Sequence, residues 1–300
     1  IGGTGGIGGS GGVSADAGPI AIAQDADCDL NGIWAVQQIT VSSALGAPQY
    51  KNAWSYQEIE HDGTAFVITK QFDCGGEVKG TIHVTLKDAP TAAMMIHNTQ
   101  AGRTGTMKKG TNGTCELTLD TFWSVRGANE AMFIPATGRN TVASLAELQA
   151  QRPLPTTLAP TGAEDWDMDG YSGLALDASG AVTGTRHSVQ RDWSKAFTDS
   201  MYTVTPATTW TADLAVRVEG EAEDSVFATQ PPDNLLLGAG TVAEATDVNN
   251  RLIMRFLGRN ASDPRVGALP TAGVDPVADP TSALATCYAI QDAMPALEAR

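Results

Sequence analysis

Short β-favouring segments separated by turn residues run through most of this sequence, and they limit its possible folds more than any other feature. The clearest pair is 53–60 and 65–71, which flank the dipeptide Asp62-Gly63. Asp-Gly between two such runs predicts a β-hairpin, because the turn needs residues that tolerate positive φ. Other segments of this kind are 33–41, 78–86, 93–97, 104–108, 115–125, 173–176, 180–189, 202–204, 213–218, 226–228, 235–242 and 252–257.

The spacing of these segments predicts a mainly β fold, either an antiparallel β-barrel or a β-sandwich. Composition agrees, since the chain has 32 Gly and 15 Pro while charged residues make up only 18%. Such a balance is typical of a turn-rich β protein. Helix-forming residues gather only at 144–151 and 289–300, so we expect one or two short helices. We also read Cys74-Gly75-Gly76 as a turn between strands.

The chain is expected to divide into two β-rich halves, with one large barrel spanning both as the alternative. The predicted divisions are a Gly-rich flexible tether at 1–24, a first half at 25–135, a connector with a short helix and prolines at 136–163, and a second half with a C-terminal strap at 164–300. Of the first 12 residues, eight are Gly, and such a segment cannot bury enough surface to offset its chain entropy.

Four cysteines, Cys28, Cys74, Cys115 and Cys287, include no C-x-x-C pair, so a zinc ribbon or a redox motif is not expected. Two disulfides in an oxidising compartment are the favoured interpretation, with buried free thiols as the alternative. Of the possible pairings we expect Cys74–Cys115 and Cys28–Cys287. The protein is therefore predicted to be secreted, periplasmic or tethered to the outer surface.

The N-terminal Gly-rich segment resembles the tethers that follow the lipid-attachment site of bacterial outer-surface lipoproteins, and the resemblance implies a lipid anchor. No apolar run reaches the length of a membrane span, so no transmembrane segment is expected. Because 34 acidic residues outnumber 19 basic ones, the net charge of −15 would repel a nucleic acid.

Two stretches carry spaced acidic residues that end in Gly, at 27–32 (DCDLNG) and 165–170 (DWDMDG). Such loops can curl oxygen ligands around a hard cation. Neither is an EF-hand loop, because Gln38 and Leu176 stand where the bidentate Glu would be. We predict a Ca²⁺ site in the second stretch, and its expected ligands are Glu164, Asp165, Asp167 and Asp169. The alternative is a solvated acidic turn.

The segment from Asp29 to Trp34 (DLNGIW) resembles the G-x-W opening of the lipocalin family. The resemblance implies an eight-stranded antiparallel barrel with an apolar cup, in which Trp34 plugs the closed end and an arginine, for which Arg126 is the candidate, lies over it. The alternative is that Trp34 is an ordinary core aromatic residue.

Catalytic signatures do not appear: the chain has no G-x-S-x-G elbow between a predicted strand and a helix, no H-E-x-x-H and no P-loop. We therefore expect a non-catalytic cell-surface protein that acts in binding or structure. The alternatives are a carrier of a small apolar molecule, a polysaccharide hydrolase that uses the carboxylates of 165–169, and a subunit of an extracellular assembly. A glycan partner would stack on exposed aromatic residues, and Trp166 is expected to be exposed because it lies between two aspartates.

Overall fold

The computed structural model describes residues 28–44, 46–86, 101–110, 115–135, 144–155, 162–197, 213–226, 240–244, 250–258 and 274–294. The predicted tether at 1–24 and the first aspartate of the first acidic stretch, Asp27, lie outside these residues. So do the segments 93–97 and 202–204, for which strands were expected.

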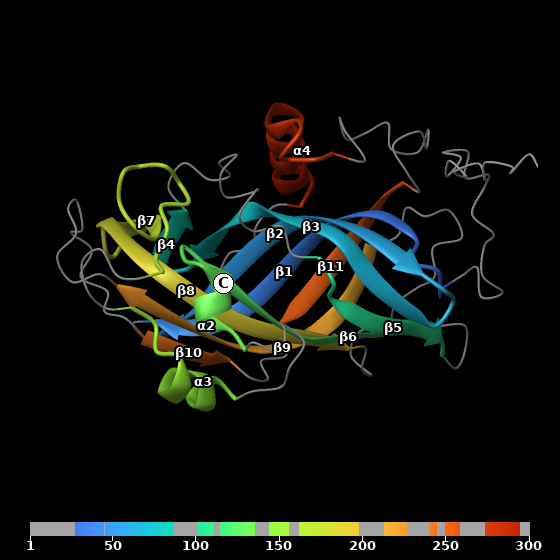
Figure 1. Cartoon of the computed structure of the whole chain (residues 1–300), viewed down its shortest axis with the longest axis horizontal. Helices are drawn as coiled ribbons and strands as arrows, with labels where there is room; N and C mark the ends of the chain where they lie inside the picture. The colour runs from blue at the N-terminus through green and yellow to red at the C-terminus, as the bar shows by residue number, and fades with distance from the viewer. Residues whose placement is uncertain are drawn as a thin grey trace, which may run out of the picture.

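The described residues fold mainly as antiparallel β-strands with a few short helices, which confirms the predicted fold class (Figure 1). The strands are β1 (Gly32–Ala44), β2 (Ala47–His61), β3 (Ala65–Lys79), β4 (Ile82–Leu86), β5 (Thr104–Lys109), β6 (Cys115–Arg126), β7 (Leu174–Gly180), β8 (Gly184–Phe197), β9 (Asp213–Val226), β10 (Gly240–Glu244) and β11 (Arg251–Gly258). The helices are α2 (Glu130–Phe133), α3 (Leu145–Gln151) and α4 (Pro280–Ala293).

All these strands belong to one sheet, in the order β10-β9-β11-β1-β2-β3-β4-β7-β8-β6-β5. Direct pairing of β1 with β11, of β4 with β7 and of β6 with β8 joins strands from both predicted halves. The Asp62-Gly63 hairpin is confirmed, since β2 and β3 pair up to His61 and Phe66. The carboxylate of Asp62 accepts hydrogen bonds from the backbone of Thr64 and Ala65 and so holds the turn.

The sheet closes into a barrel because the long strands β3 and β8 each pair with two partners along one edge. β3 pairs with β5 near its start and with β4 near its end. β8 pairs with β7 near its start and with β6 further along. A ring of six strands, β3-β4-β7-β8-β6-β5, is thereby closed. Because β8 also pairs with β9, a second ring runs β1-β2-β3-β5-β6-β8-β9-β11.

The side chains of β1 alternate between the two faces of the barrel wall, as the period of a strand requires. Trp34 and Val36 belong to the apolar core inside the second ring, with residues of β2, β3, β5, β6, β8 and β11. Ile33 and Ala35 belong to a second core outside the wall, with residues of α4. Figure 1 shows α4 on the outer side of β2 and β3.

The helix predicted at 144–151 is confirmed as α3. Ser144 caps it by accepting a hydrogen bond from the backbone of Glu147, the preferred role of serine at this position. Together with α2, it covers Trp123, Val125 and Val189 on the outside of the wall. The C-terminal strap differs from the expected irregular segment, since α4 begins at Pro280 and its Cys287 and Ile290 are fully buried.

The turn expected at Cys74-Gly75-Gly76 is wrong, because these residues lie inside β3. The register between β2 and β3 shifts opposite this point, between Ala53 and Ser55, and Gly75 has a φ of 99°. Glycine here allows a bulge that bends a long strand rather than a turn that ends it.

The single strand expected at 78–86 is interrupted at Gly80 and Thr81, where β3 ends and β4 begins. The backbone of Ile82 donates to the side chain of Gln49 at this break. A Cβ atom at Gly80 would meet the end of the Gln49 side chain, which would then have to shift.

The presence of two disulfides is confirmed, but the predicted pairing is wrong. Cys28 bonds to Cys115 across a separation of 87 residues, and Cys74 bonds to Cys287 across 213. The prediction paired cysteines by their position along the chain. Barrel closure instead brings the segment before β1 to the start of β6, and α4 docks on β3.

Candidate metal-binding loop and interior cavity

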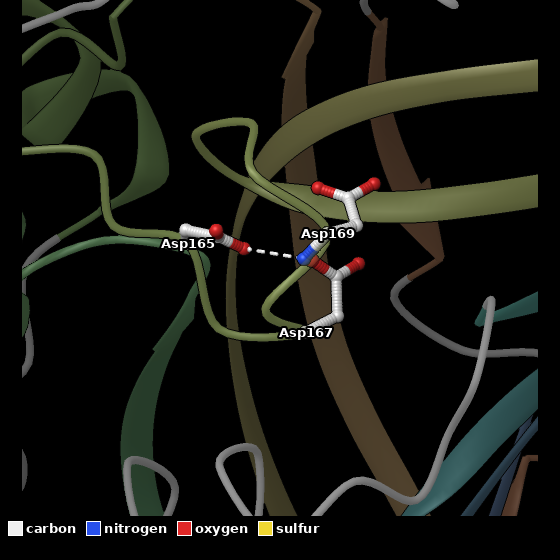
Figure 2. Close-up of side chains that lie close together, drawn as sticks. All are labelled: Asp165, Asp167 and Asp169. Atoms are coloured by element: carbon white, nitrogen blue, oxygen red, sulfur yellow. Dashed lines mark hydrogen bonds between the residues drawn. The ribbon is translucent and has the colours of Figure 1, made fainter.

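Three aspartates converge in the loop that precedes β7. One oxygen atom from each of Asp165, Asp167 and Asp169 lies within 4.8 Å of the oxygens from the other two. Figure 2 shows the three side chains gathered around one turn of the backbone. This group of carboxylates could hold a metal ion.

Backbone N–H groups shape this loop. The carboxylate of Asp165 accepts hydrogen bonds from the backbone of Asp169 and Gly170, at 3.2 and 2.9 Å (Figure 2 draws the first). Met168 has a φ of 58°, the only positive φ of a non-glycine residue within the described ranges, and Gly170 has a φ of 91°. Because the backbone is tightly curved and left-handed at Met168 and Gly170, the side chains of alternate residues point toward one another. In an extended strand alternate side chains lie side by side on one face and do not converge.

Asp167 is the buried member of the triad, with 7% of its surface exposed. Its Oδ2 accepts a hydrogen bond of 2.6 Å from the backbone of Ala175, while its Oδ1 is buried without a hydrogen-bond partner. Burial, with further contributions from Asp169 and Asp165, raises the pKa of Asp167 to about 6, although the Ala175 N–H opposes the shift. A cation between the three carboxylates would relieve both the repulsion and the unpaired oxygen.

His187 of β8 forms a hydrogen bond with the third aspartate of the triad, Asp169. Its Nε2 lies 2.7 Å from Oδ2 of Asp169, and the imidazole is fully buried against the ring of Tyr171. An imidazole that hydrogen-bonds a metal-binding carboxylate fixes its orientation. Sequence patterns do not connect His187 with the loop, because it lies 18 positions from Asp169 and no short motif links the two residues.

Glu164 lies beside the triad rather than in it. Its Oε2 accepts a hydrogen bond of 2.9 Å from the indole nitrogen of Trp166. The expectation that Trp166 is exposed is wrong, since only 3% of its surface is accessible. The indole packs inward while its polar edge is satisfied by the neighbouring carboxylate, which is the usual arrangement of a buried tryptophan.

The first acidic stretch forms a hydrogen-bonded link between strands. Oδ1 of Asp29, itself 1% exposed, accepts from both the backbone and the side-chain amide of Asn31. Asn31 in turn exchanges two hydrogen bonds with the backbone of His61. These contacts tie the entry of β1 to the end of β2.

Trp34 lies in the apolar end of the barrel interior. Its indole donates a hydrogen bond of 2.8 Å to the backbone oxygen of Leu30, and its ring meets Phe256 edge-on at 5.1 Å. Residues from seven strands surround it in one buried core, which fills this end completely enough to leave Trp34 only 2% exposed.

Beyond this apolar core the barrel interior is polar and holds a cavity of about 60 Å³. The polar side chains that line it are Gln38, Thr40, Lys51, Ser55, Gln57, Gln71, Asp73, Arg103, Ser124, Arg126, Asp192 and Ser194. They come from β1, β2, β3, β6 and β8 and from the residue before β5. A cavity of this size and polarity has room for several water molecules or a small polar ligand.

An ion-pair network forms the charged part of this cavity. Arg126 bridges two carboxylates, with Nε 3.0 Å from Asp73 and Nη1 2.7 Å from Asp192. Ser124 donates to the other oxygen of Asp192 at 2.5 Å, and Lys51 approaches Asp192 at 3.7 Å. Arg126, the candidate for the arginine of the lipocalin pattern, thus takes part in this network.

The two carboxylates of the network respond differently to their surroundings. Burial raises the pKa of Asp73, against the opposing effect of Arg126. Burial acts in the same direction on Asp192, but Arg126 and Lys51 outweigh it and lower the pKa of Asp192 to about 2.

Sequence patterns could not have identified the polar residues that line the interior cavity. Polar residues at alternate strand positions look the same whether they face a cavity or the solvent.

The fold and these two sites define a disulfide-bonded antiparallel β-barrel with a polar interior cavity and a convergent aspartate loop. The chain matches no protein-family model, no curated protein and no solved structure. The described residues include no helix that is long and apolar enough to cross a membrane.

Proposed function

We propose that this protein is a non-catalytic, extracytoplasmic binding protein that takes a small polar molecule into its barrel. The observation that carries the proposal is the divided interior, in which an apolar core fills one end and a cavity lined by polar side chains occupies the other. Polar side chains inside a barrel cost desolvation free energy unless they serve a partner or one another, so a polar interior favours a ligand site.

Two disulfides support the extracytoplasmic location, since such bonds persist in oxidising compartments. The polar lining favours a polar ligand over the apolar cargo of the lipocalin alternative. The hydrolase and glycan alternatives gain little support. Trp54, Trp123 and Trp166 are at most 5% exposed, and the three aspartates are held by loop backbone and His187.

Thermal unfolding against a panel of small ligands tests this function. The panel contains neutral polyols, amino acids, short carboxylates and a medium-chain fatty acid. We expect at least one polar class to raise the melting temperature saturably, since a ligand at a hundredfold excess over its Kd stabilises by about 2.7 kcal/mol. Stabilisation by the fatty acid alone would favour the apolar carrier, and no stabilisation by any class would refute a binding function.

We further propose that the aspartate loop binds Ca²⁺ as a structural ion. The unpartnered, buried Oδ1 of Asp167 supports this proposal most directly, because a buried carboxylate oxygen without a donor is costly in the absence of a cation. Ca²⁺ accepts flexible sets of carboxylate and water oxygens, and the partly exposed side of the loop leaves room for water ligands.

Removing the metal is expected to lower stability. The melting temperature should fall when excess chelator replaces Ca²⁺, and differential scanning calorimetry measures the difference. Asp167→Asn should abolish that difference, because an amide supplies only a neutral oxygen. Glu60→Gln, at an exposed position of β2, is the matched control and should keep it. An equal melting temperature in Ca²⁺ and in chelator for the unmodified protein would contradict the Ca²⁺ site.

A further inference from the structure

The cavity lining carries an excess of positive charge. Three cationic side chains line it, from Lys51, Arg103 and Arg126, against two carboxylates, from Asp73 and Asp192. The chain as a whole has a net charge of −15, so the cavity differs in sign from the rest of the molecule. Charged residues on the outer surface of the protein have little effect in the cavity at physiological salt, because solvent-exposed charges are screened over about 8 Å in water.

Arg103 is the cavity cation that has no carboxylate within ion-pair distance among the described residues, and Asp192 and Asp120 act on it only from further away. It is 7% exposed, and its guanidinium donates to the backbone oxygens of Asp120 and Ser194, at 3.2 and 2.6 Å. Its Cζ lies 5.7 Å from the ring centroid of Phe122. No carboxylate oxygen of the described residues lies within 4.0 Å of it. Burial lowers the pKa of Arg103 to about 9, so the cavity holds this charge at a cost that an anion would offset.

Gln57 supplies an unused acceptor in the same cavity. Its side-chain nitrogen donates to Gln71 at 2.9 Å, but its Oε1 is buried without a hydrogen-bond partner. The residue is 4% exposed and lines the cavity. A buried acceptor of this kind calls for an O–H or N–H donor.

The cavity size limits what can satisfy both groups. A volume of about 60 Å³ holds roughly four to six water-sized groups. We propose that the barrel binds a short carboxylate that also carries a hydroxyl or amino donor, with the carboxylate placed by Arg103 and Lys51 and the donor by Gln57. This inference rests on the proposed binding function and names its ligand class.

Lys51 is placed to complete the carboxylate site from the open side. Its side chain is 36% exposed and lies 3.7 Å from Asp192, which already has Arg126 as a closer partner. The ammonium group is therefore only loosely held, and it can turn to a bound anion without breaking a short ion pair.

Three molecules of nearly equal size test the inference by calorimetric titration of the full chain in saturating Ca²⁺. Lactate has both the carboxylate and the donor, propionate lacks the hydroxyl, and lactamide lacks the charge. We expect lactate to bind at least about tenfold more tightly than either of the other two, because propionate leaves the buried Gln57 acceptor unsatisfied and lactamide loses the charge-assisted hydrogen bonds.

Two variants locate the binding in the cavity. Lys51→Met should weaken lactate binding about tenfold while leaving the fold intact, because Lys51 is the most exposed member of the cluster. Arg103→Met should weaken it further, and Lys51→Met decides the matter if Arg103→Met does not fold. Glu60→Gln is the control and should bind lactate as the unmodified protein does.

Lactamide binding as tightly as lactate, or lactate binding unchanged in Lys51→Met, would overturn the carboxylate assignment and leave the proposed binding function standing. The carboxylate assignment would also be overturned if lactate did not bind while a molecule without a carboxylate, from the panel used in thermal unfolding, did. Failure of every polar molecule in both sets would overturn the binding function itself, so the two failures are distinguishable.

Discussion

Replacing both Cys74 and Cys287 with alanine is expected to lower the free energy of unfolding by about 5 kcal/mol, as the loop-entropy model gives for so long a loop. The disulfide spans 213 residues, so it restricts the unfolded chain more than a short-range bond would. It also fastens α4 to β3, where Gln291 donates to the backbone of Cys74, and next to this contact Trp54 of β2 donates to the backbone of Met294. Denaturant unfolding under non-reducing conditions measures the loss.

The matched comparison is the double alanine variant of Cys28 and Cys115, whose bond spans 87 residues. The free energy of unfolding should fall slightly less in this variant, because loop entropy grows only with the logarithm of loop length. Peptide mapping without reduction should recover a cross-linked pair that contains Cys74 and Cys287. A cross-link between Cys74 and Cys115 would contradict the pairing described here and support the one that chain position predicts.

Arg126→Met is expected to destabilise the protein by about 3–5 kcal/mol at neutral pH, since it leaves two buried carboxylates without their closest counter-ion. The side chains of Arg126, Asp73 and Asp192 are only 13, 10 and 24% exposed, so water screens this network weakly. Lys51→Met removes the more exposed partner and should cost no more than about 1 kcal/mol. Denaturant unfolding of both variants measures these differences.

The stability that Arg126→Met loses relative to the unmodified protein should become smaller as the pH falls from 7 toward 4. In the unmodified protein the pKa of Asp192 is lowered to about 2, so its stabilising contribution is present above the unfolded pKa and is lost as the pH falls toward 2. Without Arg126, burial raises the pKa of Asp73 with less opposition, and only Lys51 and Ser124 remain to lower the pKa of Asp192. The folded variant therefore binds more protons at acidic pH than the folded unmodified protein does, so the difference in stability between the two narrows. A loss that stays constant over this range would show that the carboxylates are not buried as described.

Local chemistry made much of the β architecture predictable. The Asp62-Gly63 hairpin, the start of α3 at Ser144 and the strand β11 depend on turn residues, a cap and a short β-rich run. The convergence of Asp165, Asp167 and Asp169 was predictable for the same reason, because their spacing and the following Gly170 determine a tight turn over a few residues.

Long-range contacts were beyond the reach of those patterns. Cys74 and Cys115 are nearer to each other in the chain than either is to its true partner, yet barrel closure and the docking of α4 decide the bonds. The cavity likewise depends on contacts between residues that are far apart in the chain. Lys51, Arg103, Arg126 and Asp192 come from different strands and from the residue before β5, and each alone resembles an ordinary surface residue.

The mainly β class, the Asp62-Gly63 turn and the acidic loop can therefore be predicted from the sequence, because they depend on residues a few positions apart. The strands that close the barrel, the pairing of the cysteines and the polar side chains that face inward depend on contacts between distant parts of the chain. The alternation of side chains along a strand defines two faces but does not say which face is inside. That choice is made when distant strands pair and the apolar faces are buried together.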